Sequence, residues 1–225
     1  MSPSTFEVRD ARTTESDIRF IISTFDSSLS YLNSIGSLDQ WGLIPFSERG
    51  DFAAGTRTEV EQSEENRLTG GSKENGLRMF IVEREYLEEN TEEKPPYLRI
   101  ASDGRRLLPV GFAYVRENWV PVYVKSQTHF PVPDTEGEGF LYLEVIVTDC
   151  RVGELRRGAG AALLSGIREY GRERGTKVFW VDSWAGNERR LVRYYEEQGF
   201  NVVGDWSHER ANRTPWLGTL MRMEI

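Results

Sequence analysis

The chain has 225 residues, of which 38% are hydrophobic and 12% aromatic, enough apolar side chain to build a sizeable core and to exclude global disorder. Its single cysteine, Cys150, excludes an internal disulfide and a cysteine-rich zinc site, and two histidines disfavour a multi-histidine metal centre. The formal net charge of −8 disfavours nucleic acid as the main partner, because neutralising phosphates requires a basic face.

The charge and hydropathy patterns also bear on compartment and ligands. No apolar run approaches the roughly 18 residues that cross a bilayer, and the start MSPSTFEVRD lacks a secretory pattern, so we expect a cytoplasmic protein without membrane contact. Residues 1–150 carry 15 Lys/Arg and 26 Asp/Glu, whereas residues 151–225 carry 13 and 10. An anionic ligand therefore suits the second part and a cationic ligand the first, unless the acidic surface only aids solubility.

Alternation, helical periodicity and turn residues predict the elements of the first part. We expect, in chain order, a strand at 6–10, a helix capped by Thr14 or Ser16, a helical segment at 28–35, a short helix at 58–67, and strands at 77–83 and 107–116. The helix after residue 14 carries an apolar stripe, and Gly36 would end the second segment. The last two strands are expected to pair with each other.

The second part has a regular order. We expect a strand at 140–148, a helix at 158–174, a strand at 177–184, a helix at 187–198, and strands at 200–206 and 216–224. The strand at 140–148 is the most apolar and should be central. The order predicts an α/β (α+β) fold in one domain over 1–225, with a mixed, mostly antiparallel sheet flanked by helices. Loop insertions are expected at about 48–76, 86–97 and 117–139.

A glycine-rich turn opens the helix at 158–174, in the sequence LRRGAGAALLSG. Gly158 and Gly160 let a ligand approach the backbone, and free amides with the helix dipole favour an anion. Arg156 and Arg157 are unfavourable at a helix start unless an anion lies there. Leu163 stands where a GxGxxG fingerprint needs glycine, and no GK[ST] follows. The alternative is a tightly packed helix start without a ligand.

A second motif, NERRLVRYYEEQGF at 187–200, combines an apolar helical face with two tyrosines. Tyr194 and Tyr195 precede Gly199, which ends the helix. Such a tyrosine commonly packs in a core with its hydroxyl toward water. Its hydroxyl can also protonate a leaving thiolate, so the motif has a structural and a catalytic interpretation.

In this order and separated by one strand, the two motifs resemble the GNAT superfamily of acyl-CoA-dependent N-acetyltransferases over residues 140–200. LLPVGFAYVR and FLYLEVIV are similar to the family's third and fourth strands, and YEEQGF to its YexxGF. Gly158-Ala159-Gly160 supplies the glycines of [QR]-x-x-G-x-[GA]. Leu155 departs from the Gln or Arg of that signature, and the loop before it is longer than usual, so Arg156 or Arg157 is the substitute.

The resemblance implies a site for acetyl-CoA along the glycine turn and between the strands at 140–148 and 177–184. The implied contacts are Val145, Ile146, Val147, Leu155, Arg156, Arg157, Gly158, Ala159, Gly160, Ala161, Asn187 and Tyr195. Amides of the strand would polarise the thioester carbonyl, and Asn187 would contact pantetheine. Tyr195 is the implied acid near the CoA sulfur, with Tyr194 as its rival because the spacing from Asn187 is one residue longer than in many members.

The attacking amine must lose a proton, either to a side chain or to a water chain. Glu144 is the candidate base, because an unpaired carboxylate is costly in such an apolar strand. Its alternatives are solvent exposure or a salt bridge to Arg116, and Asp182 is similarly ambiguous. His129 is a minor alternative base, and Cys150 is expected to be a structural thiol. The implied acceptor contacts are Tyr31, Gln40, Trp41, Asp182 and Trp184, where aromatic rings and carboxylates suit an amine.

The sequence thus predicts an enzyme that transfers an acetyl group from acetyl-CoA to a primary amine of a small molecule, by direct attack in a ternary complex. One alternative is acetylation of a peptide or protein amine, which the insertions at 86–97 and 117–139 disfavour by walling the groove. Another is a non-catalytic acyl-CoA sensor. No metal is expected, and the strand WLGTLMRMEI at the C-terminus is a candidate for pairing across a homodimer.

Overall fold

The computed structural model describes residues 6–70, 75–87, 95–127, 129–130, 139–210 and 214–225. Its strands are β1 (Phe6–Asp10), β2 (Gly76–Glu85), β3 (Arg99–Ile100), β4 (Arg106–Glu117), β5 (Phe140–Thr148), β6 (Val178–Trp184), β7 (Asn201–His208) and β8 (Trp216–Glu224). Its α-helices are α1 (Glu15–Ser34), α2 (Phe52–Thr69), α3 (Val122–Lys125), α4 (Ala159–Glu173) and α5 (Gly186–Glu197), and its 3-10 helices are η1 (Leu38–Gln40), η2 (Phe46–Glu48) and η3 (Cys150–Arg156).

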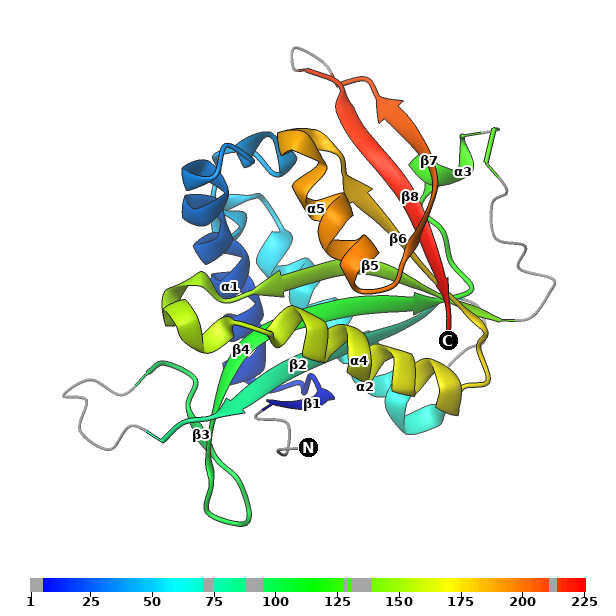
Figure 1. Cartoon of the computed structure of the whole chain (residues 1–225). Coiled ribbons are helices and arrows are strands. Elements are labelled where there is room, and N and C mark those ends of the chain that lie inside the picture. The colour runs from blue at the N-terminus through cyan, green and yellow to red at the C-terminus, as the bar shows by residue number, and fades with distance from the viewer. Residues whose placement is uncertain (1–5, 71–74, 88–94, 128, 131–138, 211–213) are drawn as a thin grey trace.

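The strands form one sheet in the order β1-β2-β4-β5-β6-β8-β7, and β3 pairs with β4 (Figure 1). Only the β5–β6 pair is parallel among the described strands. The predicted mixed, mostly antiparallel sheet and the central place of β5 are confirmed. The C-terminal strand β8 lies between β6 and β7, so both its edges are paired within the chain. The candidate pairing of this strand across a dimer is therefore wrong.

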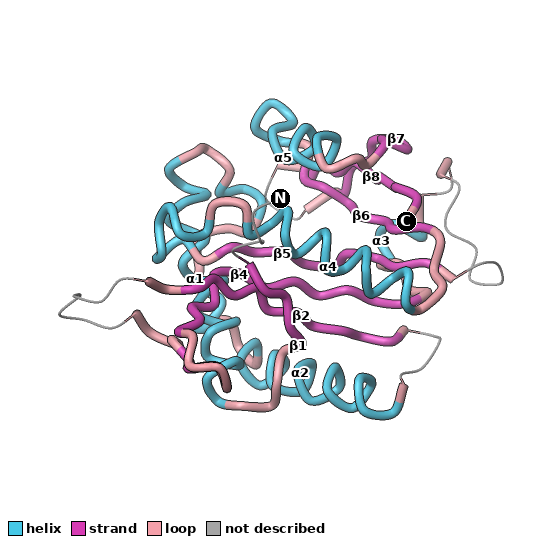
Figure 2. Tube along the Cα trace, turned by 60° about the horizontal axis from the view of Figure 1, so that its bottom comes forward, coloured by secondary structure: helices cyan, strands magenta, loops and turns pink. Residues whose placement is uncertain are grey.

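Helices cover both faces of the sheet (Figures 1 and 2). Ile167 of α4 and Val192 of α5 belong to one buried apolar cluster, with residues of β2, β4, β5 and β6. Ile21 of α1 and Val60 of α2 belong to a second cluster on the other face. No described helix has the length and apolarity needed to span a membrane. The result is a sheet buried on both sides, as expected for this order of elements.

The helix after Thr14 is longer than the sequence indicated. Thr14 caps it by accepting from the Asp17 amide, as predicted, but the helix then runs unbroken to Ser34, and the expected boundary before residue 28 is wrong. Ser27 and Ser28 caused that error, since serine often marks a break. Here their hydroxyls donate to carbonyl oxygens one turn earlier, at 2.9 and 2.6 Å, and so remain inside the helix.

The predicted insertions at 48–76, 86–97 and 117–139 lie partly outside the described residues. The first contains α2, which begins six residues before the expected helix and continues beyond its expected end. The third contains the short helix α3. Strand β3 was not predicted, because two residues carry no periodic pattern.

A β-bulge interrupts the central strand. Val145 pairs with Tyr114 and Leu143 with Val115, so Glu144 is an extra residue in β5. The parallel pairing of β5 with β6 also ends here, at Leu143 opposite Val181. Beyond this point Glu144–Thr148 and the end of β6 have no mutual pairing within the described chain. The bulge therefore marks the place where the sheet opens between two of its strands.

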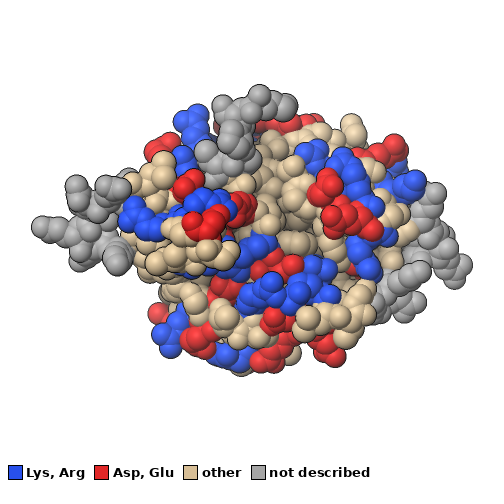
Figure 3. All heavy atoms as spheres, turned by 90° about the horizontal axis from the view of Figure 1, so that it is seen from below, with Lys and Arg blue, Asp and Glu red and all other residues tan. Residues whose placement is uncertain are grey.

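Basic and acidic side chains lie next to each other over the face seen in Figure 3. Inside the molecule, Glu83 is fully buried and accepts from Arg9 at 2.9 Å and Arg99 at 2.7 Å. Arg9 also donates to Asp17 at 2.6 Å, which ties β1 to α1. These ion pairs connect elements of the fold, so their charges are not available to a ligand.

We predict that Gly111→Ala weakens the fold where β4 and β5 meet. A Cβ at Gly111 would lie 2.8 Å from the Val147 carbonyl oxygen and 3.3 Å from the Thr148 Cα, both backbone atoms. Moving the strands apart should lower the free energy of unfolding by about 1–3 kcal/mol. Gly55→Ala in α2 is the control, since its Cβ meets nothing within 4 Å, and it should stabilise by about 0.4–1 kcal/mol. Urea unfolding measures both, and an unchanged midpoint for Gly111→Ala would contradict the prediction.

Candidate active site

Two cavities meet where β5 and β6 diverge. The first, which we call the aromatic cavity, has a volume of about 520 Å³ and lies between α1, η1, α2 and the ends of β5 and β6. The second, the glycine-loop cavity, has about 1140 Å³ and lies between α1, η3, the start of α4 and α5. Both are lined by Tyr31, Ile146, Thr148, Cys150, Arg156 and Leu191. A ligand in one cavity can therefore reach a ligand in the other.

The start of α4 gives the glycine-loop cavity its character. Gly158 has a φ of +90° and precedes the helix, whose first amides are not capped by a described side chain. A Cβ at Gly160 would lie 2.6 Å from the Tyr194 hydroxyl, so glycine keeps this wall open. The arginines lining the cavity are Arg151, Arg156, Arg157 and Arg190. Uncapped amides, the helix dipole and guanidinium groups together favour the binding of an anion at this place.

Arg156 and Arg157 differ in position. The Arg156 Nη1 donates to the Thr148 hydroxyl at 2.9 Å, and its guanidinium lies 4.6 Å from the centre of the Tyr31 ring. The Arg157 side chain is 86% exposed and lies 3.8 Å from the Glu154 carboxylate. Arg156 is thus held by contacts at the junction of the two cavities, whereas Arg157 lies at the exposed rim of the glycine-loop cavity.

Most of the cofactor residues implied by the sequence line a cavity. Val145 and Val147 line the aromatic cavity, Ile146 and Arg156 line both, and Arg157, Gly158, Gly160 and Ala161 line the glycine-loop cavity. Leu155, Ala159 and Asn187 are not among the lining residues. Leu155 packs against the core beside α4, and Ala159 is fully buried in it. Arg151 and Arg190 were not predicted from the sequence, because a charged side chain in a helix or loop is usually solvated.

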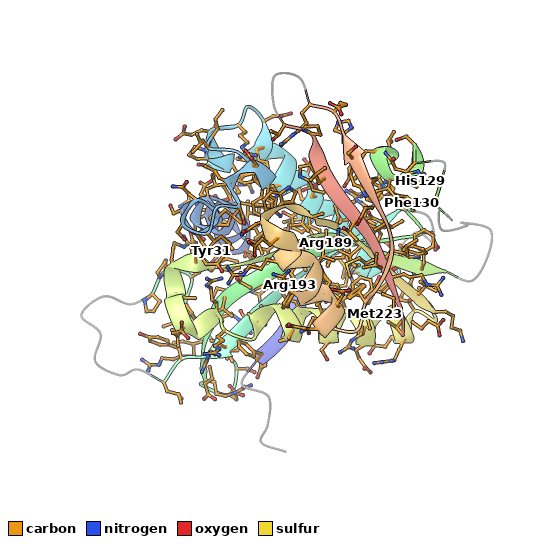
Figure 4. All side chains as sticks on the ribbon, turned by 45° about the horizontal axis from the view of Figure 1, so that its top comes forward. Tyr31, His129, Phe130, Arg189, Arg193 and Met223 are labelled. Carbon is orange, nitrogen blue, oxygen red and sulfur yellow. The ribbon has the colours of Figure 1, made fainter. Side chains whose placement is uncertain are left out.

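Asn187 connects α5 to the opposite wall. Its side-chain amide donates to the Ile35 carbonyl at 2.7 Å and to the Ser37 hydroxyl at 2.8 Å. Asn187, Glu188 and Arg189 all have positive φ, so the chain makes a left-handed turn before α5 becomes regular. Arg189 donates to Asp205 of β7 at 3.0 Å and, with Arg193, lies on α5 in Figure 4. These contacts hold a strained turn in place next to both cavities.

Aromatic rings form much of the first cavity. The predicted acceptor residues Tyr31, Gln40, Trp41, Asp182 and Trp184 all line it. Five further aromatic residues line it that were not predicted as acceptor contacts from the sequence: Phe25, Phe46, Phe52, Tyr114 and Trp216. Phe25 packs on Phe46 with 4.6 Å between ring centres and on Trp41 with 5.7 Å. This wall is both part of the core and accessible to a ligand.

His129 lies outside both cavities. Its Nε2 is 3.4 Å from the Asp205 carbonyl oxygen, and its ring packs on Phe130. Figure 4 shows these two residues on one side of α5 and Tyr31 of α1 on the other. The minor alternative of a histidine base therefore has no support. Cys150 lines both cavities and is half-buried, and burial raises the pKa of its thiol, which disfavours the nucleophilic thiolate.

Asp182 has an unusual environment for a carboxylate. It lines the aromatic cavity, and the hydroxyls of Tyr142 and Tyr123 donate to it, the latter at 3.3 Å. No described Lys or Arg pairs with it. Burial raises the pKa of Asp182 to about 6, although both tyrosine hydrogen bonds act to lower it. A carboxyl group with this pKa can accept and release a proton near neutral pH.

Glu144 and Glu59 share one guanidinium. Glu144, the bulge residue, accepts from the Arg116 Nε at 2.6 Å, which is the salt bridge that the sequence analysis left open. The Arg116 Nη2 lies 3.9 Å from the Glu59 carboxylate of α2. Burial, followed by repulsion from Glu144, raises the pKa of Glu59. Both carboxylates line the aromatic cavity.

The two neighbouring tyrosines of α5 face different cavities. Tyr195 is buried and lines the aromatic cavity, and Tyr194 is half-buried and lines the glycine-loop cavity. Burial raises the pKa of both hydroxyls, so both are protonated at neutral pH. A protonated hydroxyl is a proton donor, and Tyr195 is the one in the same cavity as Asp182.

Comparisons with known proteins agree with this geometry at the level of the fold. The sequence matches no protein-family model, and a search of curated proteins gives no match. Solved structures are similar over nearly the whole chain. An acetyltransferase of the GNAT family from Streptococcus pneumoniae is 13% identical with a TM-score of 0.52, covering 98% of this chain and 99% of that one. The chain has the GNAT fold.

Two other solved structures are similar to this chain over nearly its whole length. The yncA protein from Salmonella typhimurium, solved with its cofactor acetyl-CoA, is 14% identical with a TM-score of 0.52 and covers 98% of this chain and 94% of that one. A chimera of the spermidine N-acetyltransferase SpeG from Vibrio cholerae and hSSAT is 13% identical with a TM-score of 0.57, over 98% and 96%. The sequence resemblance to GNAT proteins is thereby confirmed for the fold.

We predict that ionised Asp182 lowers the stability of this GNAT fold. Its folded pKa of about 6 exceeds the ordinary value of 3.8, so the folded state binds the proton more tightly than the unfolded state does. The loss of stability caused by the ionised carboxylate is therefore fully present above pH 6 and absent below about pH 4. The free energy of unfolding of Asp182→Asn should therefore exceed that of the wild type by about 1–3 kcal/mol at pH 8, and this difference should vanish toward pH 4. Chemical unfolding across pH measures it.

Asp205 is the matched control for that measurement. A hydrogen bond from Thr219, followed by one from Arg189, lowers the pKa of Asp205. Asp205→Asn should consequently destabilise the protein at pH 8, the opposite sign from Asp182→Asn. A stability gain for Asp182→Asn that is the same at pH 4 and pH 8 would contradict the raised pKa.

Proposed function

We propose that this protein transfers an acetyl group from acetyl-CoA to a primary amine of a small molecule. The observation that carries the proposal is the meeting of two unlike cavities at the gap between β5 and β6. One presents helix amides and arginines to an anion, and the other presents aromatic rings and carboxylates to a cation. The GNAT fold and the acetyl-CoA of a solved neighbour support the assignment of the ligands.

Acetyl-CoA would lie with its phosphates in the glycine-loop cavity. The amides at the start of α4 and the guanidinium groups of Arg156 and Arg190 would bind the pyrophosphate and the neighbouring phosphate. The backbone of Val145 and Ile146 pairs with β4 on one edge only, so groups on its other edge face the gap. An amide there would stabilise charge on the thioester oxygen. Acetyl-CoA supplies the acyl group and the leaving thiol.

The proton transfers use two residues of the aromatic cavity. The amine nitrogen bonds to the acetyl carbon, the carbon–sulfur bond breaks, and the amine proton goes to the Asp182 carboxylate. Tyr195 donates its hydroxyl proton to the departing sulfur. Asp182 is a better base than Glu144, because Glu144 is held by the Arg116 guanidinium, whereas the side chains that bond to Asp182 among the described residues are neutral tyrosine hydroxyls. A carboxyl pKa of about 6 lies closer to the working pH.

A small acceptor is favoured over a peptide by a contact across the mouth. The Nη1 of Arg210, after β7, donates to the Asp39 carbonyl of η1 at 2.9 Å. This contact joins the β7–β8 hairpin to the loop that carries Gln40 and Trp41, and so narrows the side of the aromatic cavity that an extended peptide would need. A sensor without catalysis would need the glycine-loop cavity alone, without the pair of Asp182 and Tyr195.

The experiment that tests the proposal starts with a calorimetric titration of the protein with acetyl-CoA, compared with dephospho-CoA. Binding in the micromolar range supports the glycine-loop assignment. A panel of primary amines is then screened by the release of free CoA thiol. Absence of binding would overturn the proposed function, and binding without thiol release from any amine would favour the sensor alternative.

We predict that Tyr195→Phe lowers kcat by roughly 100-fold or more, because general acid catalysis contributes that much. The affinity for acetyl-CoA should stay within about twofold, since the hydroxyl is in the other cavity. Tyr194→Phe is the matched control and should instead change the KM for acetyl-CoA. Steady-state kinetics with both substrates separate these effects, and unchanged turnover of Tyr195→Phe would remove it from the mechanism.

We predict that Arg156→Glu weakens acetyl-CoA binding by about 10- to 100-fold, with a smaller difference at high salt, because a cation near phosphates is replaced by an anion. Arg172→Glu reverses a charge on an exposed turn of α4 away from both cavities and should bind normally. Calorimetry at low and high salt measures both variants. Equal affinities of the wild type and Arg156→Glu for acetyl-CoA would show that Arg156 does not contribute to its binding.

A further inference from the structure

The aromatic cavity carries more negative charge than a monoamine needs. Three carboxylates line it, from Glu59, Glu144 and Asp182. Arg116 lies beside two of them but carries one positive charge, at 2.6 Å from Glu144 and 3.9 Å from Glu59. Arg156 also lines this cavity, at its junction with the other one, where phosphates would take its charge. Among the described residues, Asp182 on β6 therefore has no cationic partner, and Glu59 on α2 shares its single one with Glu144.

A buried hydroxyl next to Glu59 independently indicates a polar ligand. Tyr114 of β4 lines the cavity and is only 3% exposed, and its hydroxyl has no hydrogen-bonding neighbour among the described residues besides the Thr56 side chain of α2. Burial, and then the charges of Glu59 and Glu144, raise the pKa of Tyr114, so the hydroxyl stays protonated. A buried hydroxyl whose hydrogen-bonding capacity is incompletely used is costly in a core. An ammonium group of a ligand near Glu59 would bring a polar partner close to the Tyr114 hydroxyl.

We propose that the acceptor is a diamine, with its reacting nitrogen at Asp182 and a second ammonium group at Glu59. This rests on the proposed function of the same cavity and names the substrate class. The aromatic rings of Phe25, Phe52 and Trp41 line the wall that would pack on the carbon chain between the nitrogens. A second ammonium near Glu59 relieves the repulsion between Glu59 and Glu144, which a monoamine leaves in place.

Binding of matched amines to the protein loaded with free CoA tests this without any acetyl transfer. The probes are cadaverine, with two amines on five carbons, pentylamine with one, and the amino alcohol in which a hydroxyl replaces the second amine. Calorimetry should give a dissociation constant at least about tenfold lower for cadaverine than for the other two, in line with a partly buried ion pair. Equal constants for the three probes would overturn the proposal.

A second experiment tests whether Glu59 causes the preference for cadaverine. Glu59→Gln keeps the shape and helix propensity of the side chain and removes its charge. It should reduce the cadaverine preference from about tenfold to within about twofold. Glu61→Gln removes the same charge from an exposed position of the same helix and should retain the preference. A preference that survives Glu59→Gln would assign the second nitrogen elsewhere and overturn the proposal.

The two proposals fail in different ways. Cadaverine preference without thiol release from acetyl-CoA would keep the diamine site and overturn acetyl transfer. Thiol release with equal efficiency from cadaverine and pentylamine, together with equal binding, would keep acetyl transfer and overturn the diamine. Acetylation of cadaverine with a KM that Glu59→Gln raises about tenfold, and Glu61→Gln does not, would support both.

Discussion

One extra residue in the central strand determines the layout of the site. Because Glu144 bulges out of β5, the ladder with β6 stops at Leu143 opposite Val181, and the strands beyond it are free to separate. Backbone groups that would otherwise pair across the sheet then face a gap. The same bulge directs a carboxylate into the aromatic cavity, and the gap joins that cavity to the one at the start of α4. The access between the two cavities and the placement of the Glu144 charge both follow from this local irregularity.

The sequence predicted the elements with strong periodicity and the residues that belong to a local motif. Short apolar runs located β4, β5 and β6, and the glycine turn located the start of α4, because both signals lie within a few residues. Glu59 could not be predicted, since it comes from a polar helix with no local signal and reaches the site only through the packing of α2 on β2. The bond from Asn187 to Ile35 joins residues 152 positions apart, so its tethering role was equally hidden.

The two carboxylates of the diverging strands illustrate how partners, rather than position, decide chemistry. Glu144 and Asp182 are both in apolar strands and were ambiguous from sequence. The Arg116 guanidinium pairs with Glu144 at 2.6 Å, whereas Asp182 accepts from two tyrosine hydroxyls, and its burial raises its pKa to about 6 although these hydrogen bonds act to lower it. The neutral donors still orient the Asp182 oxygens. In the proposed mechanism Tyr123 and Tyr142 would act as positioning residues, and the burial of Asp182 would keep its pKa raised despite their hydrogen bonds.

Basic residues of the second part of the chain and acidic residues of the first part line mainly different cavities. The second part, with its excess of Lys and Arg, contributes Arg151, Arg156 and Arg190 to the glycine-loop cavity, and the acidic first part contributes Glu59 and Glu144 to the aromatic cavity. Opposite fields on the two sides of one gap would draw an anionic acyl donor and a cationic acceptor in from different directions. Each field would also oppose entry of the wrong ligand. An arrangement of this kind favours a ternary complex, because neither ligand has to leave its cavity before the other binds.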